Sequence, residues 1–544
     1  MIRPIRVWLL LFALLLTSGE LRAQASPHVP LNDAVYSQLD QIIGSGLVRT
    51  AMYGQRPYRR TEIARLISEA GEQATKKSIS ASTEQILKRL ELRFARELAE
   101  IRSSESPSRT IREIAREGNV ELLVLDSPAR AIEGAPTGGI AADVNPLLNN
   151  RQGQRFAEGT TTVATSVATV SDSWSFGKHL AAQLTPRFVV GVGKSKEFTE
   201  LTLQSGGIDF SAFNLNLSIG RQQRAWGQGL EGGMLLSSSS RPLDMISIET
   251  DHPFRIPHPF GWLGSLRANA FVADLGVHQN FPHAKIVAYK LSSRLNSFLE
   301  LGVAMMVQQG GSGAPTANFV DHFFDFFPIR NDTRDNPPQF SNKIGGFDAR
   351  VRIPMLHSAQ VYVENSFDDI DPHRLQHAFW EDGGHIVGIS VAQVGASGAL
   401  SATAEYHHTG LRFYRHALYT SGVTFNRTLL GDPLGPEGDG ANARLRFDRG
   451  GRQSWQLDAA IERRDGDVWK TEQEGARANN FHFVLVESKP EEWRRRVQVQ
   501  WSWNVKTLQR LTLQGGIENV RNFVFVNNAN RANSLVSARY SWGW

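Results

Sequence analysis

Two kinds of hydrophobic pattern divide the chain. From about residue 31 to residue 115, apolar residues recur at three- and four-residue intervals, which is typical of amphipathic helices. From about residue 116 to the last residue, apolar and polar residues alternate, which is typical of strands with one apolar face. We therefore expect a helical part at residues 26–115 and a larger β part at residues 116–544.

The helical part is expected to form a small bundle of three short helices. Their apolar stripes are Leu31, Val35, Leu39 and Ile42; Ile63, Leu66, Ile67 and Ala70; and Leu87, Leu90, Phe94, Leu98 and Ile101. Thr61 is placed to cap the second helix, because its hydroxyl can accept a hydrogen bond from the first turn. Such helices can bury their stripes against one another, so a helical bundle is a simpler interpretation than a catalytic domain.

The alternation in the β part favours a membrane barrel over a soluble β-sandwich. Its clearest apolar positions are Phe213, Leu215, Leu217 and Ile219 within Ser211–Gly220; Leu445 and Phe447; Trp455, Leu457, Ala459 and Ile461; and Val497, Val499, Trp501 and Trp503. Several of the intervening residues are Asn, Gln and Arg, which suit a water-filled interior. The chain ends on Tyr540, Trp542 and Trp544, and a last strand ending on an aromatic residue is the signal that the barrel-insertion machinery reads.

A sheet in lipid has to close on itself, because each unpaired backbone group there costs several kcal/mol. At roughly 22–26 residues per strand with its connection, the β part has room for about 16 to 20 antiparallel strands. The predicted fold is therefore a mainly β, transmembrane antiparallel barrel with a helical bundle at its N-terminus.

The first residues indicate export. Arg3 and Arg6 precede an uncharged apolar stretch at residues 7–16 that is too short to span a bilayer stably. Ala23 and Ala25 supply small residues where a signal peptidase cleaves. Residues 1–25 are thus expected to be a signal peptide, with the mature chain beginning near Ser26. We then expect the bundle in the periplasm and the barrel in a bacterial outer membrane.

Composition agrees with this interpretation. The 544 residues include no Cys, which excludes disulfides, thiolate chemistry and Cys-ligated metals. The formal net charge of +5 is mildly basic and does not require nucleic acid as a partner. The 48 Gly, 12 Trp and 29 Phe residues fit a barrel with a polar lumen and aromatic girdles.

One acidic group is the best enzymatic candidate. It consists of Asp368, Asp369 and Asp371 next to His373. Outer-membrane proteases of the omptin type use acid pairs and an Asp–His pair, but a solvated loop or adventitious Ca²⁺ binding is the plainer interpretation. Segments that partly match a phosphate-binding loop or a serine nucleophile elbow lack an essential glycine.

Histidines supply the remaining candidate for a metal. His407, His408 and His416 could approach one another, yet an isolated histidine pair on a strand or loop is usually not a metal site. We therefore expect no catalytic residue, no metal site and no cofactor.

Arginine and aromatic residues form the candidate binding clusters. The first cluster contains Arg221, Arg224, Trp226 and Arg241, and the second contains Arg412, Tyr414, Arg415 and His416. Guanidinium groups make forked hydrogen bonds with carboxylates, and aromatic faces stack on sugar rings, so the combination suits an acidic polysaccharide. The alternative is that these side chains line the lumen, where Arg and Glu form ladders that stiffen a barrel. The pattern alone does not distinguish the two.

Several segments, taken in order, resemble the capsule-assembly Wzi family. They are Val29-Pro30-Leu31-Asn32, Gly54-Gln55-Arg56-Pro57-Tyr58, residues 220–229 with Arg241-Pro242-Leu243, Tyr362-Val363-Glu364, Glu405-Tyr406, and residues 430–436. The resemblance covers nearly all of the mature chain. It implies an outer-membrane barrel of about eighteen strands with a periplasmic helical bundle, acting as a lectin-like anchor for capsular polysaccharide and not as an enzyme.

The leading hypothesis is a non-enzymatic protein that binds and anchors capsular or exopolysaccharide at the cell surface. Its expected partners are a secreted acidic polysaccharide, outer-membrane lipid and lipopolysaccharide, and the barrel-insertion machinery. Because loops diverge most in such families, the resemblance does not identify the sugar. The alternatives are a porin or channel for small solutes and, less favoured, a hydrolase that uses Asp368, Asp369 and His373.

Overall fold

A computed structural model describes most of the chain beyond the leader. The described residues are 25–77, 79–102, 111–135, 139–148, 162–193, 197–315, 341–356, 358–368, 379–395, 398–473 and 481–543. The expected signal peptide, apart from Ala25, lies outside these residues, and so does Trp544.

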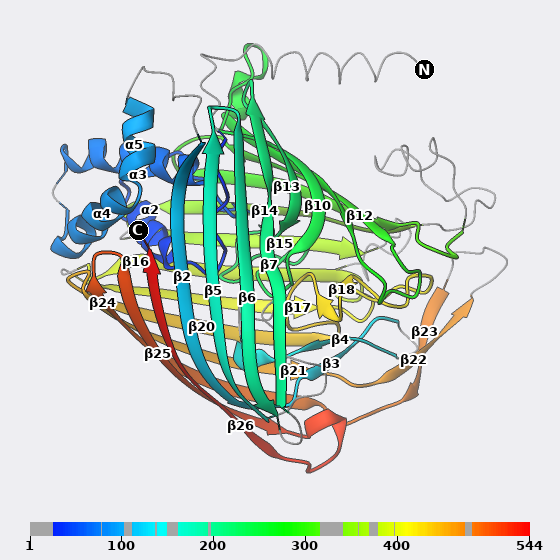
Figure 1. Cartoon of the computed structure of the whole chain (residues 1–544). Helices are drawn as coiled ribbons and strands as arrows, with labels where there is room; N and C mark the ends of the chain where they lie inside the picture. The colour runs from blue at the N-terminus through cyan, green and yellow to red at the C-terminus, as the bar shows by residue number, and fades with distance from the viewer. Residues whose placement is uncertain are drawn as a thin grey trace.

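Within the described residues, eighteen antiparallel strands form one closed barrel (Figure 1). They are β2 (Ile111–Asp126), β5 (Thr162–Phe176), β6 (Leu180–Gly193), β7 (Glu197–Ala212), β8 (Leu215–Gln222), β10 (Leu243–Thr250), β11 (Ser265–Asp274), β12 (Lys285–Arg294), β13 (Leu299–Gln309), β14 (Ser341–Ile353), β15 (Ala359–Asp368), β16 (Gly383–Val394), β17 (Leu400–Thr409), β20 (Gly438–Arg449), β21 (Gln453–Arg464), β24 (Glu492–Lys506), β25 (Gln509–Arg521) and β26 (Arg531–Gly543). The first and last of these strands close the barrel, with Glu117 opposite Gly543 and Asp126 opposite Ser534. The predicted barrel and its strand number are confirmed.

Alternation along the strands separates a lipid-facing surface from the lumen. In β24, Val497 and Val499 are 43% and 45% exposed on the outer face, whereas Gln498 between them is 1% exposed. Such a period of two gives an apolar band outside and polar side chains inside. Among the described residues, no helix is long and apolar enough to cross a membrane.

The segment Ser211–Gly220, which was expected to be one strand, contains a hairpin turn. β7 ends at Ala212 and β8 begins at Leu215, and between them Phe213 and Asn214 have φ of 57° and 83°. Two left-handed residues make the tight hairpin turn whose twist matches antiparallel strands. The prediction of one strand across Ser211–Gly220 was wrong, because a two-residue turn does not interrupt a pattern of period two.

The helical part contains four helices in its described residues. They are α2 (Ala34–Gly44), α3 (Arg60–Ala74), α4 (Ala81–Arg93) and α5 (Ala95–Arg102). The third expected helix is interrupted at Phe94, which ends α4 with φ −107° and ψ 21°, and Ile101 is 37% exposed at its far end. Thr61 is not a cap: α3 begins at Arg60, and the preceding Arg59 makes no side-chain capping bond. Residues 111–115, grouped with the helices in the sequence-based division, lie in β2.

Smaller elements lie inside the barrel and at its rim. The described residues include four two-stranded sheets, which pair β1 (Gln55–Arg56) with β9 (Ala225–Trp226), β3 (Arg130–Glu133) with β4 (Ile140–Val144), β18 (Thr424–Phe425) with β19 (Thr428–Leu429), and β22 (Val468–Gln473) with β23 (Phe481–Glu487). Short 3-10 turns are η2 (Phe260–Leu263) and η3 (Phe523–Phe525).

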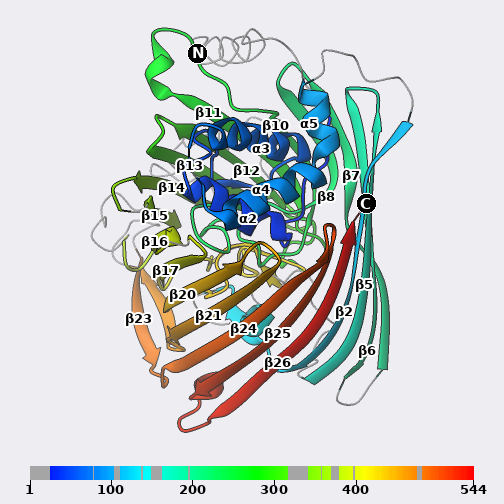
Figure 2. The same ribbon diagram turned by 90° about the vertical axis from the view of Figure 1, so that its left-hand side faces the viewer.

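The helices occupy one mouth of the barrel, beside the C-terminal end of β26 (Figures 1 and 2). We call this mouth the bundle end. Short turns join strands there, such as the two residues between β24 and β25. The opposite mouth, which we call the loop end, carries long connections such as residues 410–437 between β17 and β20.

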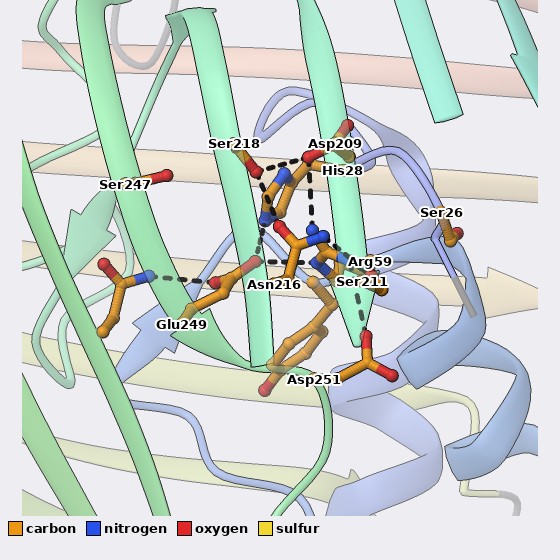
Figure 3. A network of polar contacts seen from close by, with 12 residues as sticks. Ser26, His28, Arg59, Asp209, Ser211, Asn216, Ser218, Ser247, Glu249 and Asp251 are labelled. Atoms are coloured by element: carbon orange, nitrogen blue, oxygen red, sulfur yellow. Dashed lines mark hydrogen bonds and ion pairs between the residues drawn. The ribbon is translucent and has the colours of Figure 1, made fainter. Parts of the chain in front are cut away.

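Arg59 attaches the helical part to the barrel wall (Figure 3). Its guanidinium group is fully buried and reaches Glu249 at 2.7 Å, Asp209 at 3.2 Å and Asp251 at 3.3 Å. It also donates to Ser211 Oγ at 3.2 Å. A buried cation needs this degree of pairing to offset the loss of hydration. Because the Arg59 side chain binds these residues of the barrel wall, it does not cap α3.

Candidate functional site

Two chain segments fold back into the lumen at the loop end and fill it. They are residues 223–242, between β8 and β10, and residues 410–437, between β17 and β20; together we call them the plug. Apolar residues of the plug pack in one core with inward-facing wall residues, and the members from the plug are Trp226, Met234, Leu235, Leu236, Phe413, Tyr414, Tyr419, Val423, Phe425, Leu429 and Leu430. An apolar core of this size holds the plug firmly in the barrel.

Two buried wall carboxylates accept hydrogen bonds from the plug backbone. Glu364 on β15 accepts from the N–H of Met234 at 2.6 Å, and Glu405 on β17 accepts from the N–H of Leu230 at 2.7 Å. Buried backbone donors require such acceptors. Gly227 approaches Glu364 so closely that a Cβ atom would lie 2.1 Å from its Oε2, and its φ is +136°. Glycine is therefore required there.

Trp226 connects the plug with the N-terminal region. It lies in β9, which pairs with β1, and Gln55 is its partner in that small sheet. Its ring is 1% exposed and packs on Phe271 of β11 at a centroid distance of 5.3 Å. Trp226 therefore lies in the lumen core and not on a surface.

Tyr414 joins the two segments of the plug. Its hydroxyl donates to the carbonyl oxygen of Met234 and accepts from the N–H of Asp432 at 2.8 Å. The side chain is completely buried. This residue holds residues 223–242 against residues 410–437.

Arg415 and His416 are also buried in the plug. Arg415 donates to Glu437 at 2.9 Å. The His416 Nδ1 accepts from the N–H groups of Leu418 and Tyr419, each at 3.1 Å. Because Nδ1 is the acceptor, His416 shapes the following turn of residues 418–421.

Arg224 and Arg241 occupy the ends of the first plug segment. Arg224 is buried and donates to Gln222 Oε1 at 2.7 Å and Ser247 Oγ at 3.1 Å. Arg241 is half-buried, and its backbone N–H lies 3.4 Å from Thr428 Oγ1. Both residues thus belong to the lumen.

Arg221 and Arg412 stand apart from the buried group. Arg221 lies on the outer face of the barrel in a two-pronged ion pair with Asp244, at 2.7 and 2.8 Å. Arg412 donates to both carboxylate oxygens of the buried Asp382. The structure therefore brings Trp226 and Tyr414 into one core and places Arg221 on another surface.

A pocket of about 540 Å³ lies at the loop end, next to the plug. It is lined by Ala135, Gly139, Ile140, Ala141, His278, Thr420, Ser421 and Arg427. The Arg427 side chain is 39% exposed and donates to Asp143 at 3.1 Å. Ser421 Oγ accepts from the N–H of Asn280 at 2.6 Å, which joins the pocket wall to the connection between β11 and β12. The pocket thus offers a guanidinium group, an imidazole and hydroxyls on a fixed frame.

This pocket has no signature in the sequence. Its lining comes from the β3–β4 hairpin, the β11–β12 connection and the plug, so no periodic or local pattern unites it. One predicted residue lies directly behind it: His416 holds the turn that contains Thr420 and Ser421. The sequence held only one weak signal, the polar pair Asn426-Arg427, which the structure shows to be a two-residue turn with φ of 46° and 61°.

The acidic candidates for catalysis are only partly described. Asp368 points into the lumen, is buried, and donates its backbone N–H to the carbonyl of Asp382 at 3.0 Å. Asp369, Asp371 and His373 lie outside the described residues.

The candidate histidines do not converge. His407 faces the lumen between Glu405 and Asp432, with nitrogen-to-oxygen distances of 3.1 and 2.7 Å. His408 is the next residue of the same strand and so faces outward. In the part of the chain that the structure describes, no group of three or more His, Asp or Glu side chains could hold a metal ion.

Comparison with known proteins agrees with this architecture. The structure is similar to Wzi of Escherichia coli, described as an outer-membrane protein involved in group 1 capsule assembly and a carbohydrate-binding β-barrel, with a TM-score of 0.62 and 18% identity over 95% of this chain and 99% of that one. OccD3 (OpdP) of Pseudomonas aeruginosa shares less, with a TM-score of 0.44 and 9% identity over 81% of this chain and 93% of that one.

Sequence comparison points to the same group of proteins. An uncharacterized 55.8 kDa protein from the cps region of Klebsiella pneumoniae is 27% identical over 151 residues, which are 27% of this chain and 29% of that relative's length. The match therefore spans less than a third of that relative. The family model of the capsule assembly protein Wzi matches residues 132–535. Because that match covers well over half of the chain, this outer-membrane β-barrel belongs to the capsule assembly protein Wzi family.

Proposed function

We propose that this protein binds a secreted polysaccharide at the loop end of the barrel and anchors it to the cell surface without altering it chemically. The observation that carries the proposal is the loop-end pocket, in which Arg427, His278 and the hydroxyls of Thr420 and Ser421 border a space of about 540 Å³. Guanidinium groups suit carboxylates, and hydroxyl and imidazole groups suit sugar hydroxyls.

The orientation of the barrel supports an extracellular ligand. Outer-membrane barrels have short periplasmic turns and longer extracellular loops. Short turns and the helices lie at the bundle end, so we place that end in the periplasm and the loop-end pocket outside the cell.

The plug supplies the rigidity that a binding site needs. Sites hold their geometry when a packed second layer supports the contacting side chains. Here the turn of residues 418–421 is held by His416, and Tyr414 joins that segment to the rest of the plug. We therefore assign Tyr414, Arg415 and His416 a positioning role behind the pocket, and Arg427 a direct contact with the glycan.

The membership of the Wzi family also supports the proposal, since the E. coli protein with the same fold is described as binding carbohydrate.

A glycan array probed with the detergent-purified barrel tests the proposal, with the host's own polysaccharide included. We expect binding that weakens as salt rises, because charges at a surface are screened. Arg427→Gln should weaken it roughly tenfold, the loss expected for one charge-assisted hydrogen bond. Arg449→Gln, at the exposed bundle-end terminus of β20, is the matched control. Absence of binding by the unaltered barrel to any polysaccharide of its host would refute the proposal.

A further inference from the structure

A second cavity lies at the bundle end of the lumen, on the other side of the plug. It has a volume of about 770 Å³ and extends between the N-terminal helices and the inner wall of the barrel. This volume lies within the range of roughly 300–1,000 Å³ found for ligand-binding pockets. Residues of the plug, including Gly229 and Glu231, line this cavity, while Thr420 and Ser421 line the loop-end pocket.

The lining of the cavity carries an excess of positive charge. Apart from Arg221, whose side chain lies on the outer face, the described residues that border it include eleven arginines, no lysine, and eight Asp or Glu residues. Many of these arginines are paired: Arg444 reaches Glu231 at 3.0 Å, and Arg539 reaches Glu121 at 2.8 Å. The positive charge that no carboxylate pairs with is therefore confined to part of the cavity lining.

Three arginines that make no ion pair with any described carboxylate border the cavity: Arg89 on α4, Arg446 on β20 and Arg510 on β25. Within the described ranges, Arg446 has no hydrogen-bond or ion-pair partner, and its Nε is buried without one. Among the described residues, Arg510 reaches only Ser454 Oγ, at 3.4 Å, and Arg89 donates to the carbonyl of Gly451. All three border the cavity, and Arg510 is repelled by Arg446 and Arg89 while Asp33 and Asp448 attract it.

Among the described carboxylates, Asp448 lies near this cluster and attracts its arginines, but it makes no ion pair with any of the three. Its Oδ1 accepts from the N–H of Gly451 at 2.6 Å and from Ser82 Oγ at 3.2 Å, so it holds a turn and the start of α4. Like charges brought together out of bulk water destabilise a structure unless a counter-charge joins them. The cluster therefore places three guanidinium groups beside one carboxylate, and this excess of positive charge favours binding of an anion.

The wall beside the cluster indicates what kind of anion fits. Register places Arg446 opposite Gln456, Gln456 opposite Gln500, and Gln500 opposite Gln514, so a row of amides crosses β21, β24 and β25. Thr512, Ser541 and Trp542 border the same cavity. Amides and hydroxyls exchange hydrogen bonds with sugar hydroxyls. Guanidinium groups bind carboxylates through two parallel hydrogen bonds.

We propose that Arg89, Arg446 and Arg510 form a second binding site, at the bundle end of the lumen, for an oligosaccharide segment that carries carboxylates, such as a run of uronic acids. Arg446 and Arg510 would bind a carboxylate, and the row of glutamines would bind the ring hydroxyls. This site rests on lumen residues alone, so it stands or falls independently of the loop-end pocket.

Isothermal titration of the full-length barrel in detergent tests this site. The probes are trigalacturonate, the neutral galactotriose and inorganic phosphate. We expect trigalacturonate to bind with an affinity that falls as salt rises, and galactotriose and phosphate to bind at least tenfold more weakly. Arg446→Gln and Arg510→Gln should each weaken trigalacturonate binding about tenfold or more, whereas Arg449→Gln, at the outward-facing end of β20, should leave it unchanged.

The unfolding temperature separates a binding role from a structural one. Because Arg446→Gln relieves repulsion in the empty barrel, its unfolding temperature without ligand should equal or exceed that of the unaltered protein. A fall in that temperature would identify Arg446 as a structural residue and overturn the proposal. Equal affinity for phosphate and trigalacturonate would overturn the assignment of a glycan, and unchanged binding in both glutamine variants would overturn the site.

Discussion

At the scale of single residues, buried arginines make many of the contacts between parts of the chain that are far apart in sequence. Arg59 links the N-terminal region to β7 and β10, and Arg350 on β14 donates to Gln228 of the plug at 2.7 Å. A guanidinium group suits this role because it offers five donors in a fixed plane and stays charged when buried. The same property explains why the arginine and aromatic clusters were ambiguous in the sequence: a sugar contact and a lumen ladder need the same side chain.

Replacing Arg59 should release the helices from the barrel. Arg59→Met leaves Glu249, Asp209 and Asp251 without their common cation, a change that costs about 3–5 kcal/mol in buried ion pairs. We expect a lower unfolding temperature and rapid proteolysis of residues 25–102 in the folded barrel. Arg102→Met, at the exposed end of α5, is the control and should behave like the unaltered protein. Equal protease resistance in the two variants would contradict the assigned role of Arg59.

At the scale of elements, the helices are joined to one another and to β2 by ion pairs at their ends. Asp33 caps α2 by accepting from the N–H of Val35, and Arg93 at the end of α4 binds it with two nitrogens, at 2.7 and 2.8 Å. Burial alone would raise the pKa of Asp33, but the Arg93 guanidinium holds that pKa below its ordinary value of 3.8. The Asp33 cap is a local feature that the sequence analysis overlooked, whereas its ion pair with Arg93 could not be predicted because the partner lies on another helix.

Acid should remove the stabilisation that Asp33 supplies. Because the pKa of Asp33 is lowered in the folded protein, its contribution is fully present above the ordinary value of 3.8 and is lost as pH falls through the lowered folded-state pKa. Asp33→Asn retains a capping side chain and removes the ion pair. We expect its unfolding temperature to lie below that of the unaltered protein at pH 7, and the difference to shrink below about pH 4. A difference that does not change with pH would contradict this account.

At the scale of the whole molecule, the plug divides the lumen into a loop-end pocket and a bundle-end cavity. Closure leaves the barrel sheet without a free edge, and the plug core fills the part of the lumen between the two mouths. This arrangement favours binding at either mouth over diffusion through the barrel.

Conductance measurements distinguish an occluded barrel from the alternative of a diffusion channel. The unaltered protein should show no stable open current in planar bilayers. Gly227→Ala should produce one, or at least lower the unfolding temperature, because a Cβ 2.1 Å from Glu364 displaces the plug. Gly515→Ala is the control, since a Cβ there meets no atom within 4 Å. A large steady current through the unaltered barrel would favour a porin.

The sequence alone determined the architecture, because the spacing of apolar residues along a strand or helix shows which of its faces is buried. Alternation through β20, β21 and β24 predicted the barrel, and the stripes around Leu39 and Leu87 predicted the bundle. Only the tertiary structure decided the placement of the arginine and aromatic residues. Arg224 and Tyr414 lie in connections without a period, and a connection folds into the lumen or away from it according to wall partners such as Glu364 and Glu405, which are distant in sequence.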